Sequence, residues 1–294
     1  MAVTAAQVKE LRDKTGAGML DCKNALAETN GDMEKAIDWL REKGIAKSAK
    51  KAGRIAAEGL TKVLVDGNKA VLLEVNSETD FVAKNAQFLK LLDDVCATIV
   101  KSDAKTNEEA LALACNGGTL NDEFVNATAT IGEKIVLRRF EVIEKNDDEI
   151  FGTYSHMGGS KTSVVVCKGG NDELAHFLAM QVASMAPTYV SAADMPADVV
   201  EHERKVQTEI VKNDEKFAGK PEQVIQGAIE GKVSKSLKEM CLVDQEYFMD
   251  TAKKVSAVLK ENNAECVKFV RYAVGEGLEK REENFAEEVA KQMQ

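Results

Sequence analysis

Leu60–Val100 reads LTKVLVDGNKAVLLEVNSETDFVAKNAQFLKLLDDVCATIV, and its hydrophobic period changes part-way along. Apolar runs at 61–65 and 70–75 flank Asp66-Gly67-Asn68, which is a turn signal of the hairpin type. From about residue 80 to residue 100 the apolar side chains recur instead at helical spacing. This stretch therefore predicts two antiparallel strands followed by a helix.

The start of this helix bears on whether Phe81 is core or surface. Thr79 is expected to cap the helix and Asp80 to lie in its first turn, where the helix dipole favours a carboxylate. Phe81 is nearly in phase with the apolar stripe, so periodicity predicts that its ring joins the core. The alternative is that the stripe overruns the core and leaves an exposed ring beside a carboxylate, which is a good binding hot spot. The expected stripe comprises Phe88, Leu89, Leu92, Val95, Cys96 and Ile99.

The same order of elements recurs about ninety residues further along the chain. Residues 150–154 and 163–167 predict two strands, and Met157-Gly158-Gly159 predicts the turn between them. Asp172 then opens a helix, and a further strand is expected at 134–144. The pattern predicts an α+β chain with two related units that pack side by side.

Three short amphipathic helices are expected before this core. The first two cover Val3 to Lys14 and about Met19 to Glu28, and Asp32 is expected to cap the third. A DNA-reading helix-turn-helix is the alternative, which the acidic balance disfavours. Residues 43–54 carry five positive charges and no acidic residue. This is typical of a solvated linker or exposed helix, or of a contact with an acidic partner.

The C-terminal part of the chain is mostly helical in pattern. Residues 196–240 predict a charged helical hairpin that turns at Gly219-Lys220-Pro221. A late strand is expected at 267–274, and a closing helix at 278–294. The apolar face of the closing helix must dock on this chain or on a partner, and it carries Phe285, Val289 and Met293.

Composition limits the classes of function. The 294 residues have a formal net charge of −10, which argues against a general nucleic-acid binder because phosphate contacts need surplus Lys and Arg. The N-terminus lacks the apolar core of a signal peptide, and no apolar run approaches membrane-spanning length. A cytoplasmic protein without a membrane partner is expected.

Motifs for covalent chemistry, metal binding and nucleotide binding are missing. Six cysteines occur without a C-x-x-C pair, and the three histidines lack metal-ligand spacing. Residues 158–162 come nearest to a phosphate-binding loop, but Ser stands where Gly must precede Lys, and the segment lies between strands. We therefore expect no enzyme activity, no cofactor, no metal site and no direct nucleotide binding.

Two stretches resemble the signatures of the elongation factor Ts family: LRDKTGAGMLDCKNAL at 11–26 and EVNSETDFVAKN at 74–85. Weaker resemblance continues at GKP (219–221), LVDQEYF (242–248) and RYAVGEG (271–277). The family binds the translation GTPase elongation factor Tu in its GDP form and promotes GDP release so that GTP can bind.

The resemblance implies the domain organisation. It assigns 1–54 to a helical bundle of the ubiquitin-associated (UBA) type with its basic linker, and 55–144 to a first core subdomain of strands and a helix. Residues 145–277 are then a second, related core subdomain that carries a coiled-coil hairpin insertion at about 196–240. Residues 278–294 form the C-terminal helical module.

The resemblance also implies which residues contact elongation factor Tu. Thr79, Asp80, Phe81 and Val82 match the segment that enters between two helices of the GTPase domain and disturbs its magnesium site. Further contacts are implied for Arg12, Met19, Leu20, Lys23, Ile131, Gly132 and His156. After His156 this chain departs from the family, because Ser160-Lys161-Thr162-Ser163 is longer and more polar. For Met19 and Leu20, packing inside the small bundle is an equally good interpretation.

Two other functions compete with nucleotide exchange. One is an adaptor that holds partners through the bundle and hairpin without altering nucleotide affinity. The other is RNA binding through residues 43–54, which predicts a steep salt dependence.

Overall fold

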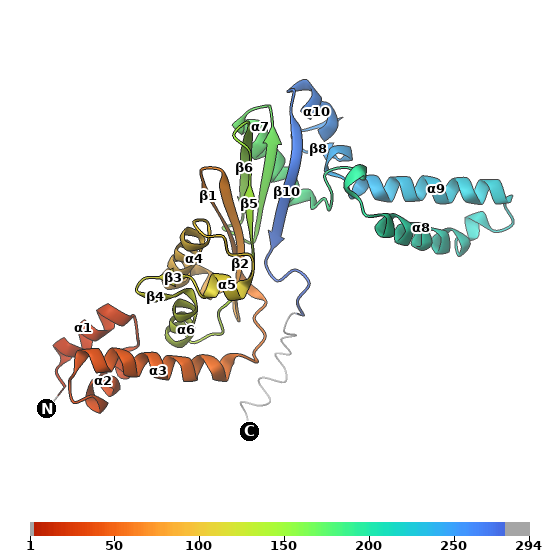
Figure 1. Ribbon diagram of the computed structural model, residues 1–294. Coiled ribbons are helices and arrows are strands. Elements are labelled where there is room, and N and C mark those ends of the chain that lie inside the picture. Colours follow the sequence, from red (N-terminus) through yellow and green to blue (C-terminus); the bar gives the residue numbers. More distant parts are fainter. Residues whose placement is uncertain (1–2, 280–294) are drawn as a thin grey trace. The chain divides into compact units, whose positions relative to one another are not determined.

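The computed structural model describes residues 3–279 and shows a mixed α+β chain, as expected from the sequence (Figure 1). It divides into two compact units. Of the described residues, the first unit takes 3–143, 157–161 and 272–279, and the second takes 144–156 and 162–271. The closing helix expected at 278–294 lies, beyond residue 279, outside the described residues. Within the described part of the chain, no helix is both long and apolar enough to cross a membrane.

The first unit begins with three helices: α1 (Ala5–Thr15), α2 (Met19–Glu28) and α3 (Met33–Lys51). The side chains of Thr4 and Asp32 cap α1 and α3, and Gly16 ends α1 in the left-handed conformation that glycine adopts readily. This helical N-terminus is compatible with a UBA-type bundle. Its core consists of Val8, Leu11, Ala17, Cys22, Ala25, Leu26 and Ala36.

The basic stretch at 43–54 continues α3 as far as Lys51 and finds partners inside the first unit. Lys47 Nζ lies 2.8 Å from the Asp21 carboxylate, and Lys51 Nζ donates to the carbonyl of Thr128 at 3.3 Å. Partial burial lowers the pKa of the Lys51 ammonium, because desolvation disfavours its charged form. Most residues from 43 to 51 are nevertheless exposed, which agrees with the exposed-helix interpretation of this stretch up to Lys51.

The first sheet has the strand order β1-β2-β5, with β1 (Glu58–Asp66), β2 (Lys69–Ser77) and β5 (Val136–Glu144). β1 and β2 form the hairpin at the turn signal of the sequence, with Asp66 opposite Lys69. Helices α4 (Ala86–Ile99) and α6 (Leu120–Ile131) share the hydrophobic core of this sheet. The shorter elements of the unit are α5 (Asn107–Leu111), β3 (Ala114–Cys115) and β4 (Gly118–Thr119).

One position in the expected stripe of α4 is wrong. The sequence predicts that Leu89 belongs to the buried stripe, but Leu89 is exposed. Leu91, which was not included in the stripe, is buried instead. The apolar face of α4 is wide and packs against both the first sheet and α6. Helix α6 was not predicted from the sequence.

The second sheet has the strand order β10-β7-β6, with β6 (Glu149–His156), β7 (Lys161–Lys168) and β10 (Glu265–Ala273). In both sheets the second strand of a hairpin is central, and a later strand pairs with its other edge. Helix α7 (Asp172–Met185) follows β7 as α4 follows β2. The remaining elements around its core are β8 (Glu246–Tyr247), β9 (Asp250–Lys254) and α10 (Val255–Glu261).

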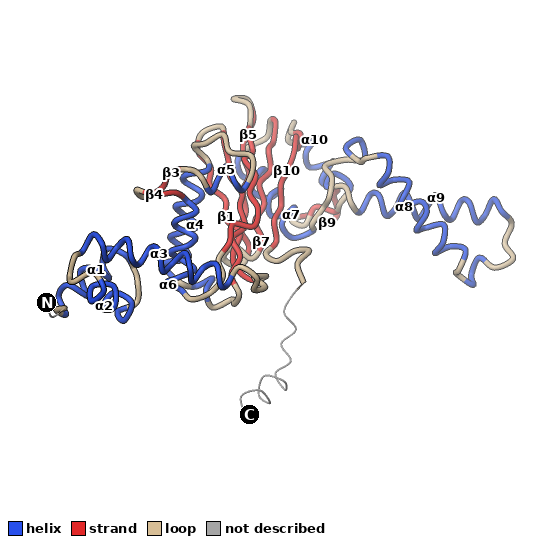
Figure 2. Tube along the Cα trace, turned by 60° about the horizontal axis from the view of Figure 1, so that its bottom comes forward, coloured by secondary structure: helices blue, strands red, loops and turns tan. Residues whose placement is uncertain are grey.

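Helices α8 (Ala197–Lys212) and α9 (Glu222–Glu239) occupy the stretch for which the sequence predicts a hairpin (Figure 2). They pack against each other through a small apolar core. Val211, Ile229 and Val233 form its buried centre. This core is much smaller than those of the two sheets, as expected for two helices that cover only one face of each other.

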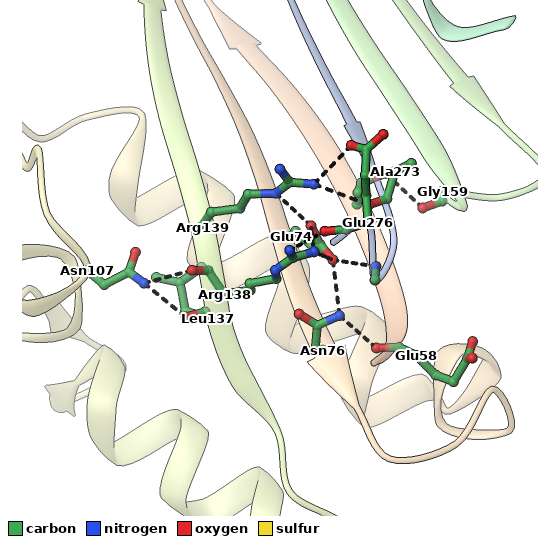
Figure 3. Close-up of polar contacts among 12 residues, drawn as sticks. Glu58, Glu74, Asn76, Asn107, Leu137, Arg138, Arg139, Gly159, Ala273 and Glu276 are labelled. Atoms are coloured by element: carbon green, nitrogen blue, oxygen red, sulfur yellow. Dashed lines mark hydrogen bonds and ion pairs between the residues drawn. The ribbon is translucent and has the colours of Figure 1, made fainter. Parts of the chain in front are cut away.

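A buried carboxylate stands in the middle of the first sheet (Figure 3). Glu74 on β2 is fully buried; Arg138 Nη1 lies 2.9 Å from its Oε1, and Arg139 Nε lies 2.7 Å from its Oε2. The backbone N–H of Gly275 also donates to Glu74, at 2.8 Å. Arg139 stacks on the ring of Tyr272, whose pKa burial raises to about 12. The network fixes the chain after β10 against β2 and β5.

Candidate functional site

The connection between β2 and α4 carries the segment that the sequence analysis singled out. Helix α4 begins at Ala86, and its cap is Asn85, whose Oδ1 accepts from the N–H groups of Gln87 at 2.8 Å and Phe88 at 3.3 Å. The prediction that Thr79 caps the helix and that Asp80 lies in its first turn is therefore wrong. The hydroxyl of Thr79 is engaged elsewhere, because it donates to Glu133 at 2.6 Å.

Phe81 is exposed and Val82 is buried. Phe81 is 80% exposed, whereas Val82 is 5% exposed and packs in the hydrophobic core that the first sheet shares with α4 and α6. The chain here makes a short 3₁₀ turn, Val82–Lys84, in which Lys84 N–H donates to the carbonyl of Phe81. This turn interrupts the helical phase before α4 begins. The core prediction for Phe81, which assumed a continuous helix, is therefore wrong.

Thr79 and Asp80 lie on the same connection with different surroundings. Thr79 is half-buried, and its carbonyl accepts from the Ser77 hydroxyl at 2.9 Å. Asp80 is exposed, and its carbonyl accepts from the N–H of Ala83 at 3.2 Å. A carboxylate and an aromatic ring thus project next to each other from a turn with internal hydrogen bonds.

Ile131 and Gly132 are brought to this connection from about fifty residues away in sequence. Ile131 is the last residue of α6, and Gly132 ends that helix with φ of 93°. Glu133 directly follows and accepts three hydrogen bonds from the Thr79 segment. Gln87 Nε2 also donates to Thr130 Oγ1 at 2.7 Å, which joins the start of α4 to the end of α6. The fold therefore assembles two of the predicted contact segments into one surface region.

The predicted contact residues of the bundle all face solvent. Met19 is 62% exposed and Leu20 is 70% exposed at the start of α2, and Arg12 on α1 and Lys23 on α2 are exposed as well. The interpretation of Met19 and Leu20 as bundle core is therefore wrong, because later residues of α2 fill that core. Two large apolar side chains and two basic ones are thus left exposed on α1 and α2.

His156 is the last residue of β6 and belongs to the second unit. It is half-buried, and its Nδ1 lies 3.0 Å from the Tyr154 hydroxyl. The following Met157 is exposed and has φ of 47°, so the chain leaves the strand in a tight turn. The polar residues noted after His156 in the sequence begin β7 from Lys161 onward.

Two residues of this site, Glu133 and Asn85, were not predicted from the sequence. Asn85 carries a local signal, since asparagine is a preferred helix cap, but Thr79 carries a similar one. Glu133 has no local signal, because its partners lie 54 and 55 residues away along the chain. Across residues 3–279, no three His, Cys, Asp or Glu side chains lie close enough together to hold a metal ion. All six cysteines are free thiols.

A family model described as elongation factor TS matches residues 78–276. The chain belongs to the elongation factor Ts family. Elongation factors Ts are nucleotide exchange factors that act on elongation factor Tu in translation elongation, so membership assigns this chain to that class and implies elongation factor Tu as its partner. The match to elongation factor Ts begins at Glu78, the first residue of the connection that exposes Phe81. The resemblance drawn from the sequence signatures is thereby confirmed.

Proposed function

We propose that this chain releases GDP from elongation factor Tu by inserting the segment Thr79–Val82 beside the magnesium and phosphate site, so that GTP can bind. The observation that carries the proposal is the 80% exposed ring of Phe81, held between a hydrogen-bonded Thr79 and a buried Val82. A large apolar side chain on a fixed turn can act as a wedge with little loss of conformational entropy on binding.

The physical basis is the geometry that magnesium requires. Mg²⁺ demands near-ideal octahedral coordination and bridges the nucleotide phosphates to the GTPase. A wedge that shifts one supporting helix therefore weakens the binding of both the ion and the nucleotide. Phe81 supplies the wedge, and Asp80 draws away groups that order the outer shell of the metal.

Exchange of this kind is a coupling free energy between two binding events. The factor binds best to nucleotide-free elongation factor Tu, and nucleotide weakens the binding of the factor by the same ratio. The chain itself makes no covalent bond, binds no nucleotide directly and needs no cofactor. It acts in the cytoplasm, with neither nucleic acid nor membrane as a partner.

Other parts of the chain complete the proposed contact. Ile131 and Gly132 extend the surface around Phe81, and His156 contacts the partner from the second unit. On the bundle, the exposed residues that contact the GTPase domain are Arg12, Met19, Leu20 and Lys23. We assign the bundle and linker to 1–54, the core subdomains to 55–144 and 145–277, the coiled-coil insertion to about 196–240, and the C-terminal module to 278–294.

The decisive experiment is stopped-flow release of fluorescent GDP from bacterial elongation factor Tu, chased with excess unlabelled GDP. The chain should accelerate release by orders of magnitude, and Phe81→Ala should reduce that acceleration about a hundredfold, as expected for a central hot spot. Thermal unfolding should be nearly unchanged, because the ring buries little surface in its own chain.

Leu89→Ala is the matched control, since Leu89 is also an exposed apolar residue and lies on the adjacent helix α4. It should retain full exchange activity. A well-folded chain that binds elongation factor Tu without accelerating release would contradict exchange and support the adaptor function instead.

A further inference from the structure

A single carboxylate holds the start of the Phe81 connection. Glu133 Oε2 accepts from the backbone N–H groups of Glu78 at 3.1 Å and Thr79 at 2.9 Å. Glu133 Oε1 accepts from the hydroxyl of Thr79 at 2.6 Å. Charge-assisted hydrogen bonds of this kind are stronger than neutral ones, and here three of them converge on two consecutive residues.

The contact is reciprocal. Glu78 Oε1 accepts from the backbone N–H of Lys134 at 2.6 Å, and Arg54 Nη1 lies 3.3 Å from the same oxygen. Lys134 Nζ in turn donates to the carbonyl of Arg54 at 2.9 Å. The segment before Phe81 and the segment after α6 therefore each bind the backbone of the other with a glutamate.

The segment that carries Glu133 is itself fixed. Gly132 ends α6 with its N–H donating to the carbonyl of Thr128, and Ile135 N–H donates to the Thr128 hydroxyl at 3.2 Å. Ile135 is buried in the core of the first sheet. Glu133 thus lies between a helix end and a buried residue, which makes it a rigid support for a neighbouring loop.

We propose that Glu133 is a positioning residue for exchange, which acts by fixing the backbone of Thr79 so that Phe81 projects in one orientation. This inference rests on the proposed function. On the other side of Phe81 along the chain, Val82 is buried in the core, so only Asp80 and Phe81 lie between the two fixed residues, Thr79 and Val82. Without Glu133, two backbone N–H groups and a hydroxyl lose their acceptor, and the connection can adopt other conformations. The ring must then be ordered during binding, which lowers the rate of exchange.

The test is a double-mutant cycle in the GDP release assay, with elongation factor Tu and the full chain. Glu133→Ala should reduce the acceleration about tenfold when Phe81 is present, and by less than about twofold in the Phe81→Ala background. A residue that acts only through Phe81 has nothing left to position when the ring is gone. Equal fold-reductions in the two backgrounds would overturn the proposal.

Glu133→Gln distinguishes the positioning role of Glu133 from a role of its negative charge. It also serves as a second variant in case Glu133→Ala does not fold. The Gln carbonyl can accept both N–H groups, and its amide can donate to the Thr79 hydroxyl, so exchange should stay within about twofold of the unmodified chain. A loss as large as that of Glu133→Ala would instead mean that the negative charge itself meets the partner, and it would overturn the proposal.

Glu109→Ala is the matched structural control. Glu109 also accepts two backbone N–H groups of a turn, from Lys105 at 2.7 Å and Thr106 at 3.2 Å, but that turn does not carry Phe81. It should lower the thermal midpoint about as much as Glu133→Ala while leaving exchange unchanged. If Phe81→Ala alone has no effect, the proposed function fails; if Phe81→Ala is severe and Glu133→Ala is silent, only the positioning role fails.

Discussion

The two sheets of this molecule connect their central strands to a helix in different ways. In the first unit eight residues (78–85) link β2 to α4, whereas in the second unit three residues (169–171) link β7 to α7. Both connections end in an asparagine whose side chain caps the helix, Asn85 in one and Asn171 in the other. The scaffold is thus the same at both ends of the connection, and the difference lies in the residues between.

The short connection leaves no room for a projecting side chain. Gly169 and Gly170 both have positive φ, and a Cβ on Gly169 would lie 2.2 Å from the carbonyl oxygen of Asn263. The long connection has no glycine and projects Phe81 into solvent, while Val82 returns to the core. The longer connection can therefore expose a side chain while Glu133 binds its start at Thr79 and the core buries Val82.

The two central strands also differ in the side chains that they bury. A substitution that tests this difference is expected to have the largest effect on stability. β2 buries Glu74 with Arg138 and Arg139, whereas the buried side chains of β7 are all uncharged: Thr162, Ser163 and the apolar run from Val164 to Cys167. Glu74→Ala should cost about 3–5 kcal/mol, because it leaves two guanidinium groups without their carboxylate in a partly buried network. Urea unfolding followed by circular dichroism measures the loss.

Val165→Ala on β7 is the comparison variant, and it should cost roughly 2 kcal/mol for the cavity that it leaves. A smaller loss for Glu74→Ala than for Val165→Ala would show that the ion network adds little to the first sheet.

The next largest effect is expected when the long connection is replaced by the short one. Replacing residues 78–85 with Gly-Gly-Asn, the sequence of the short connection, should reduce exchange about a hundredfold, because no hot-spot residue remains exposed. The chain should also lose roughly 2 kcal/mol of stability, since Val82 leaves the core. GDP release and urea unfolding measure the two consequences.

A second variant keeps Thr79 and Val82 and changes only Asp80 and Phe81 to alanine. It should lose exchange to the same extent without the loss of stability. Retained exchange in a folded chain with the short connection would place the wedge elsewhere in the molecule.

The smallest effect on stability is expected from removing the helix caps Asn85 and Asn171, which tests whether the two caps contribute equally. Asn85→Ala and Asn171→Ala should each cost about 1 kcal/mol, since each removes the side-chain acceptor at the start of a helix. Urea midpoints compare the two, with Asn85→Ser and Asn171→Ser as controls that keep an acceptor. A much larger loss at Asn85 would show that the long connection, unlike the short one, depends on its cap.

Elements with local signals could be predicted from the amino-acid pattern alone. The turn at Asp66-Gly67-Asn68, the helix that opens at Asp172 and the two helices around Gly219-Lys220-Pro221 all lie where turn residues and hydrophobic period place them. These patterns act within a few residues, so the chain carries them whatever surrounds it. The two signature stretches were also sufficient to indicate the family.

The start of α4 and the exposure of Phe81 depend on contacts between residues far apart in the sequence. Thr79 and Asn85 are both acceptable caps, and the choice falls to Asn85 because Glu133 engages the Thr79 hydroxyl and backbone from the end of α6. Helix α6, which was not predicted from the sequence, also packs against α4 and shares the core in which Leu91 is buried, whereas Leu89 is exposed. Such long-range contacts select among local alternatives of similar free energy, and a local pattern does not contain them.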